Sequence, residues 1–212
     1  MLVKDVMTRN PLFIHPEMSI PEARALMKKE KVGRLIVLDK NKKLVGIITE
    51  RDIVNASPSG ATTLDMYEMS HLLSKLKVET VMKKKVITVN ENEVIEEAAR
   101  IMVDSDISAL PVMNDSLLVG IVSDGDLYRI FIKLFGAREA GVRLTMLVPE
   151  KKGELNKITS AIAEKGGNVI SLLISDGSDI SNKKCIIKVS EITKEQLESA
   201  VRPFAIEILD IR

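Results

Sequence analysis

The pattern of apolar and polar positions along the first two thirds of the chain occurs twice. The stretch that begins at Val3 aligns with the stretch that begins at Val78, and the methionines of the two stretches pair at a spacing of 75 residues. The spacing falls to 74 after one deletion in a turn, so that later glycines and aspartates still coincide. The aligned pairs are Met7 with Met82, Met27 with Met102, Gly46 with Gly120, and Asp52 with Asp126. The chain therefore contains an internal duplication.

Each copy shows the same succession of periodicities. A short β-rich piece, 12–14 or 86–89, precedes a stretch whose apolar residues recur every three or four positions, which predicts a helix with one buried face. Two apolar runs separated by a polar turn follow, and then a second helical segment. The predicted unit is β-α-β-β-α. Because a unit of about 55 residues buries little surface alone, we expect the two copies to pack sheet to sheet about a pseudo-twofold axis.

The chain is expected to divide into four parts. These are a first repeat over 1–57, a helical linker over 58–77, a second repeat over 78–135, and a C-terminal domain over 142–212. In the last part strands and helices alternate as β-α-β-β-α-β, which is the ferredoxin-like arrangement. The fold class is therefore α/β, more strictly α+β.

The charge balance excludes some classes of partner. Lys and Arg number 31 against 30 Asp and Glu, and the small basic clusters contain no interleaved aromatic residues. A protein whose main partner is a nucleic acid normally carries a basic surface. No stretch approaches the ~20 apolar residues that a membrane span needs. We expect a cytoplasmic protein without a membrane or nucleic-acid partner.

The rarer residue types give no sign of a metal or redox centre. Cys185 lies in the apolar run CIIKV, where a small buried strand residue is expected. His15 and His71 have no ligand cluster at metal-binding spacing around them, so neither a metal nor a cofactor is expected. A single glutamine, Gln196, beside 29% charged residues indicates a thermophilic source.

Candidate binding chemistry lies where a strand enters a helix in each copy. The two motifs are Thr49-Glu50-Arg51-Asp52 and Ser123-Asp124-Gly125-Asp126. A carboxylate there accepts hydrogen bonds from the vicinal hydroxyls of a ribose, while a hydroxyl and helix N-terminal N–H groups face a phosphate. The same spacing also forms a capping box, in which the acid bonds back to the N-cap residue. The residues alone leave both interpretations open.

The repeated motifs resemble a known family. VMT and VMK before the first strands, Ser108-Ala109-Leu110-Pro111, and LVGIITERD with LVGIVSDGD are similar to paired CBS domains, the Bateman module, over residues 1–135. The resemblance implies an adenosine-containing ligand, AMP, ATP or S-adenosylmethionine, in clefts across the pseudo-twofold axis. It implies that Thr49 and Asp52 face Ser108, Ala109 and Pro111, and that Ser123 and Asp126 face Thr8, Gly33 and Arg34. Arg51 would give the first cleft a cation where the second has Gly125.

A second resemblance concerns the C-terminal domain. Gly153-Glu154-Leu155 after the first strand and Asn168-Val169-Ile170 after the first helix resemble an ACT domain. This implies an amino-acid ligand at a dimer interface, held by Gly153, Leu155 and Asn168. Lys152 stands where members of that family usually have proline.

The order of domains resembles the AcuB-like acetoin-utilisation family, which implies control of a metabolic enzyme in trans. The sequence contains no G-x-S-x-G, H-E-x-x-H, Walker loop or Cys/His pair. We therefore expect a non-catalytic, homodimeric regulator that senses an adenine nucleotide. The alternative is a protein-interaction subunit that binds no ligand.

Overall fold

The computed structural model describes residues 1–56 and 75–212, and these form two units, Met1–Leu127 and Tyr128–Arg212. The linker helix predicted over 58–77 lies almost wholly outside the described residues. The boundary between the units falls inside one helix, Asp124–Leu134, and thus earlier than the predicted end of the second repeat at residue 135. Within these described ranges no helix is both long enough and apolar enough to cross a membrane.

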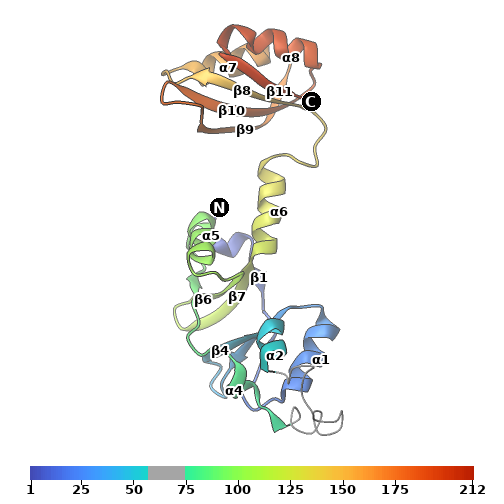
Figure 1. Cartoon of the computed structure of the whole chain (residues 1–212), viewed down its shortest axis with the longest axis vertical. Coiled ribbons are helices and arrows are strands. Elements are labelled where there is room, and N and C mark those ends of the chain that lie inside the picture. Colours follow the sequence, from blue (N-terminus) through green and yellow to red (C-terminus); the bar gives the residue numbers. More distant parts are fainter. Residues whose placement is uncertain (57–74) are drawn as a thin grey trace. The chain divides into compact units, whose positions relative to one another are not determined.

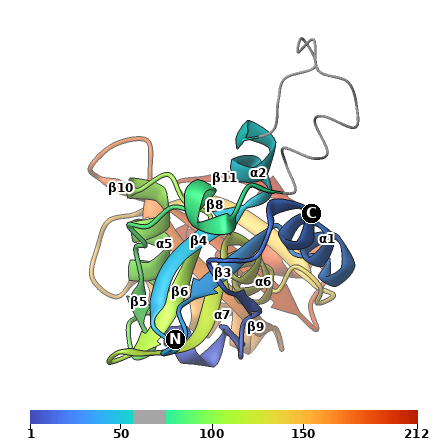
Figure 2. The same ribbon diagram turned by 90° about the horizontal axis from the view of Figure 1, so that it is seen from below.

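The first unit contains two copies of the predicted β-α-β-β-α succession. The first copy consists of β2 (Phe13–Ile14), α1 (Ile20–Glu30), β3 (Arg34–Leu38), β4 (Leu44–Thr49) and α2 (Glu50–Ala56). The second consists of β5 (Val89–Asn90), α5 (Ile95–Asp104), β6 (Ala109–Asn114), β7 (Leu117–Ser123) and α6 (Asp124–Leu134). The sheet orders are β2-β3-β4 and β1-β7-β6-β5, where β1 is Thr8–Arg9. The helices α1 and α5 flank the strands on opposite sides (Figures 1 and 2).

The segment before each copy joins the sheet of the other copy. Thr8 in β1 pairs with Ile121 in β7. In the reciprocal contact the Ile47 N–H donates to the Lys83 carbonyl at 3.1 Å, and the Lys83 N–H donates to the Ile47 carbonyl at 2.9 Å. Short helical turns precede both exchanged segments, at Val3–Asp5 and Val78–Val81. The segment that opens each repeat in the sequence therefore packs on the sheet of the other repeat.

The exchange explains why methionine and glycine recur at matching positions. A Cβ atom added at Gly46 would collide with the sulfur of Met82, and one added at Gly120 would collide with the sulfur of Met7. Each glycine thus leaves room for the methionine of the segment that arrives from the other copy. The exchanged segments also complete the cores, since Val3 and Val78 are fully buried.

The amphipathic helices bury the faces that the periodicity predicts. In α1 the buried residues are Ile20, Ala23 and Met27, and in α5 they are Ile95, Ala98 and Met102. At the start of α1 the Glu22 carboxylate accepts a hydrogen bond from the Ser19 N–H at 2.9 Å, as a capping box requires. The first-copy core comprises Ile14, Ile20, Ala23, Met27, Leu35, Val37, Ile48, Ile53 and Val78.

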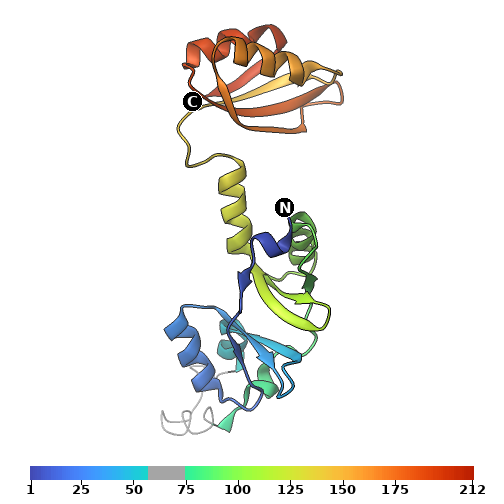
Figure 3. The same ribbon diagram turned by 180° about the vertical axis from the view of Figure 1, so that it is seen from behind.

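The second unit has the predicted β-α-β-β-α-β order. Its elements are β8 (Val142–Pro149), α7 (Glu154–Glu164), β9 (Asn168–Asp176), β10 (Asn182–Ser190), α8 (Lys194–Val201), a 3-10 turn (Arg202–Phe204) and β11 (Glu207–Ile211). The sheet is antiparallel with the order β11-β8-β10-β9, and α7 and α8 cover one of its faces (Figures 1 and 3). Cys185 of β10 is buried in this core, and burial raises the pKa of its thiol to about 11.

Candidate functional site

A cleft of about 290 Å³ lies between the two copies in the first unit. Its volume lies just below the range of about 300 to 1,000 Å³ that small-molecule sites usually occupy. Strand ends from both copies and the exchanged segment after Met82 supply its walls. The lining residues are Gly33, Arg34, Ile47, Thr49, Glu50, Arg51, Lys83, Lys85, Val86, Ile87, Asp106, Ile107, Ser108, Ala109 and Pro111.

Most of the residues assigned to the first cleft from the sequence lie together. Thr49 and Arg51 come from the first copy, at the junction of β4 and α2, and they share the cleft with Ser108, Ala109 and Pro111 of the second copy. Both copies are therefore needed to build this one site.

Gly33 and Arg34 differ from their expected position. The resemblance placed them opposite Ser123 and Asp126, but they line the first cleft. The β3–β4 register is the reason, because Arg34 pairs with Thr49 and the Gly33 carbonyl accepts a hydrogen bond from the Glu50 N–H at 3.0 Å.

The same backbone contact occurs in the second copy. The Ser108 carbonyl accepts a hydrogen bond from the Asp124 N–H at 3.1 Å, and Ala109 pairs with Ser123. The starts of β3 and β6 thus each lie beside the motif of their own copy, and both also line the first cleft.

The first motif forms a capping box. Asp52 Oδ2 accepts hydrogen bonds from the Thr49 N–H at 2.9 Å and from the Thr49 hydroxyl at 2.6 Å, and the Asp52 N–H donates to Thr49 Oγ1 at 3.2 Å. The other oxygen, Oδ1, lies 4.0 Å from Lys83 Nζ. Oδ2 therefore belongs to the cap, whereas Oδ1 lies nearer to Lys83, a residue of the cleft wall.

The second motif has the same cap. Asp126 Oδ2 accepts hydrogen bonds from both the N–H and the hydroxyl of Ser123, each at 2.8 Å. Asp126 is buried, whereas Asp52 is half-buried. Thr8, the remaining residue assigned to this motif, lies in β1 beside Ile121 of β7.

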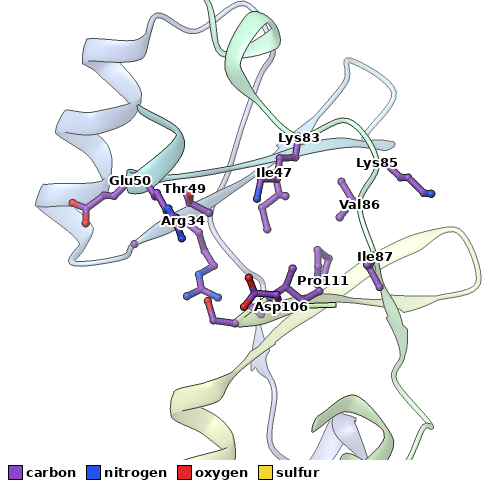
Figure 4. A pocket seen from close by; sticks show the side chains of 15 residues that line it. Arg34, Ile47, Thr49, Glu50, Lys83, Lys85, Val86, Ile87, Asp106 and Pro111 are labelled. Carbon is purple, nitrogen blue, oxygen red and sulfur yellow. The ribbon is translucent and has the colours of Figure 1, made fainter. Parts of the chain in front are cut away.

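The walls of the first cleft combine apolar surface with directed charges. Figure 4 shows Arg34 and Lys83 extending into the cleft, with Asp106 across from them, while Lys85 and Glu50 point away from its centre. Apolar side chains form much of the remaining wall, namely Ile47, Val86, Ile87, Ile107 and Pro111. Such a combination suits a ligand with a flat apolar ring and a polar or charged tail.

Lys83, Asp106 and the apolar residues at 86 and 87 were not among the predicted site residues. The sequence contains one indication of Lys83: it directly follows Met82, which aligns with Met7 and lies in the exchanged segment. The repeat pattern alone does not reveal that this segment crosses to the other sheet.

The residues assigned to an amino-acid site do not lie together in one chain. Gly153 is the N-cap of α7 with φ 87°, Leu155 is 40% exposed, and Asn168 is the first residue of β9 after that helix. A helix of 11 residues extends about 16 Å. Gly153 and Asn168 are consequently at opposite ends of α7.

Comparison with known proteins agrees with the duplicated architecture. The family model for the CBS domain matches residues 3–59 and 78–133. The L-aspartate semialdehyde sulfurtransferase of Methanocaldococcus jannaschii is 34% identical over 131 residues, which are 61% of this chain. The chain spans only 23% of that enzyme's length.

Three solved structures share the fold of the first unit. The CBS domain pair of protein MJ0100, in complex with 5'-methylthioadenosine and S-adenosyl-L-methionine, is 33% identical with a TM-score of 0.53 and covers 66% of this chain and 98% of its own. AcuB of Vibrio cholerae, named for acetoin utilization, is 31% identical with a TM-score of 0.54 and covers 66% and 96%. CBSX2 in complex with AMP is 29% identical with a TM-score of 0.51 and covers 62% and 96%. Since the family model matches more than half of the residues, the chain belongs to the family of CBS-domain proteins, with two CBS domains in tandem.

Proposed function

We propose that this protein is a non-catalytic regulator that binds an adenosine-containing ligand in the cleft between its two CBS domains. The observation that carries the proposal is that both copies contribute residues to one cleft, Thr49 from the first and Ser108 from the second. The ligands of two structural relatives support it, because 5'-methylthioadenosine, S-adenosylmethionine and AMP all contain adenosine. AMP, ATP and S-adenosylmethionine are therefore the candidate ligands.

The cleft offers a partner for each part of an adenosine compound. Adenine would lie between the apolar side chains of Ile47, Ile87 and Pro111, where removal of its faces from water favours binding. The ribose would bond Asp52 Oδ1, since Oδ2 already accepts two hydrogen bonds from Thr49. Because this ligand would contact both copies, it would stabilise one arrangement of the copies over others. That shift in population is the signal we propose for regulation.

A second candidate function is that of an interaction subunit without a ligand. The observation in its favour is that Asp52 and Asp126 both act as capping residues. A duplicated cap stabilises two helices without any nucleotide. In this case the cleft would be only a gap in the packing interface between the two domains and would bind no ligand.

For the second unit we propose the role implied by its resemblance to an ACT domain, with a homodimer and control of a metabolic enzyme in trans. Because Gly153 and Asn168 lie at opposite ends of α7, an amino acid held by both would have to lie between two chains. A homodimer supplies that arrangement. Its mass in sedimentation would be twice the 23.5 kDa of one chain.

The proposal is tested by thermal unfolding with AMP, ATP, S-adenosylmethionine and 5'-methylthioadenosine. At a hundred times its dissociation constant, a ligand of the folded state raises the free energy of unfolding by about 2.7 kcal/mol. We expect at least one of the four compounds to raise the melting temperature. If none does so at millimolar concentration, the interaction subunit becomes the better account.

Two matched variants locate the binding site. Ile87→Trp places a bulky ring in the cleft from a position that is 39% exposed, so folding should tolerate the change while the ligand-induced shift disappears. Leu12→Trp is the control, because Leu12 occupies the corresponding position of the first copy and is 40% exposed. The shift should persist in this control.

A further inference from the structure

The two copies differ in the charges that they place beside their motifs. Lys83 of the exchanged segment extends into the first cleft (Figure 4), and its repeat counterpart is Thr8. Both positions have the same backbone setting: Lys83 pairs with Ile47 of β4, and Thr8 pairs with Ile121 of β7. The same strand position thus carries an ammonium group in one copy and an uncharged hydroxyl in the other.

Lys83 is anchored by its backbone and adjustable at its tip. Its two hydrogen bonds with Ile47, at 2.9 and 3.1 Å, fix the Cα at the wall of the cleft. Its side chain is 62% exposed, and its ion-pair partner among the described residues, Asp52 Oδ1, is 4.0 Å from Nζ. An exposed ion pair of this length contributes little free energy. Nζ can therefore turn toward an anionic ligand at small cost.

Arg34 provides a second cation in the same space. It extends from the start of β3 toward the second copy, where Asp106 lies on the opposite wall (Figure 4). Asp106 offsets part of this positive charge, and Glu50 points away from the centre of the cleft. Among the described residues, the acid that forms an ion pair with Lys83 is Asp52, and this pair is loose at 4.0 Å.

We propose that Lys83, together with Arg34, makes the first cleft selective for phosphorylated adenosine over uncharged or cationic adenosyl compounds. The inference rests on the proposed function, since it assumes that adenosine binds in this cleft. A phosphate receives charge-assisted hydrogen bonds from an ammonium and a guanidinium group. The sulfonium of S-adenosylmethionine would instead be repelled by both. At the second motif, Thr8 and Gly125 stand where the first has Lys83 and Arg51, so no comparable preference arises there.

Calorimetric titration of the full-length protein with AMP, adenosine and S-adenosylmethionine tests the inference. We expect AMP to bind at least about tenfold more tightly than adenosine, because one hydrogen bond to a charged group is worth that factor. Lys83→Met should weaken the binding of AMP more than that of adenosine and so bring the ratio of the two affinities toward one. Lys83→Arg should keep the preference for AMP.

Lys84→Met is the matched control, since Lys84 belongs to the same segment, is exposed and does not line the cleft. It should leave both affinities as they are. Equal affinities for AMP and adenosine in the wild type, an unchanged ratio in Lys83→Met, or tighter binding of S-adenosylmethionine than of AMP would overturn this inference and leave the proposed function standing. Absence of binding by all three compounds, and by ATP and 5'-methylthioadenosine as well, would overturn both.

Discussion

The two CBS domains of this chain are alike in the features that fold them and different in the charges that lie beside their motifs. Both use a hydroxyl residue and an aspartate to cap the second helix, with hydrogen bonds between 2.6 and 2.9 Å to the carboxylate oxygen. Both exchange the segment that precedes them, and in both a glycine accommodates the incoming methionine.

The differences lie at positions where folding makes no demand on the side chain. Lys83 and Thr8 are held through their backbones, so either side chain fits the sheet. At the start of the second helix, likewise, the first copy has the charged residue Arg51 where the second copy has the uncharged Gly125. A duplicated scaffold can thus keep its cores and caps while its two motifs acquire different electrostatic environments.

Substitution of the paired glycines is the strongest test of the shared scaffold. Gly46→Ala and Gly120→Ala should each destabilise the protein by about 1 to 3 kcal/mol, because the new methyl group overpacks the contact with Met82 or Met7. Denaturant melts measure the loss. Gly120→Ala should cost more, since its Cβ would also lie 3.0 Å from the Thr8 carbonyl oxygen, against 3.3 Å from the Lys83 carbonyl oxygen at Gly46.

Rescue experiments check the cause of that loss. Met82→Ala in the Gly46→Ala background should recover part of the stability, and Met7→Ala should do so in the Gly120→Ala background. If either glycine can be replaced by alanine without a loss of stability, the two glycine–methionine contacts are not equivalent. The two copies would then not share this packing feature.

Removal of the capping carboxylates should have a smaller effect. Asp52→Ala and Asp126→Ala should each cost about 0.5 to 2 kcal/mol of stability without ligand, since each removes the carboxylate that accepts two hydrogen bonds from the N-cap residue. Asp126 should be the more costly of the two, because it is more deeply buried. Denaturant melts give the cost, and calorimetry on the same variants gives the affinity for AMP.

The two measurements separate the capping role from ligand binding. We expect Asp52→Ala to lose affinity for AMP beyond its loss of stability, because Oδ1 lies 4.0 Å from Nζ of Lys83, which lines the cleft although Asp52 itself does not. Asp126→Ala should lose stability and keep most of the affinity. Lowered stability with unchanged affinity in both variants would contradict a ligand role for Asp52 and favour the interaction subunit.

Much of the fold was predictable because it depends on local patterns. The three- and four-residue spacing of Ile20, Ala23 and Met27 predicts α1 and its buried face, and a chain that alternates strands and helices predicts the order of elements in the second unit. The exchange was not predictable in this way. A strand as short as Thr8–Arg9 has no periodicity that identifies its partner sheet.

The site was predicted only in part for a related reason. Strand register places Gly33 and Arg34 beside Thr49, and register is a property of the folded sheet. A run of three lysines usually forms a solvated surface, and this holds for Lys84, which is exposed; Lys85 lines the cleft, but its side chain points away from the centre. Only the backbone pairing with Ile47 distinguishes Lys83 from its neighbours.

The stoichiometry of AMP binding tests the central claim most directly, namely that two similar domains build one cleft suited to a phosphorylated adenosine ligand. Calorimetric titration of the wild-type chain with AMP at moderate ionic strength measures it. We expect one tight site per chain, with any binding at the second motif at least about tenfold weaker. Two sites of equal affinity per chain would contradict the charge difference between the motifs, and a titration without binding would contradict the claim that the cleft binds a nucleotide.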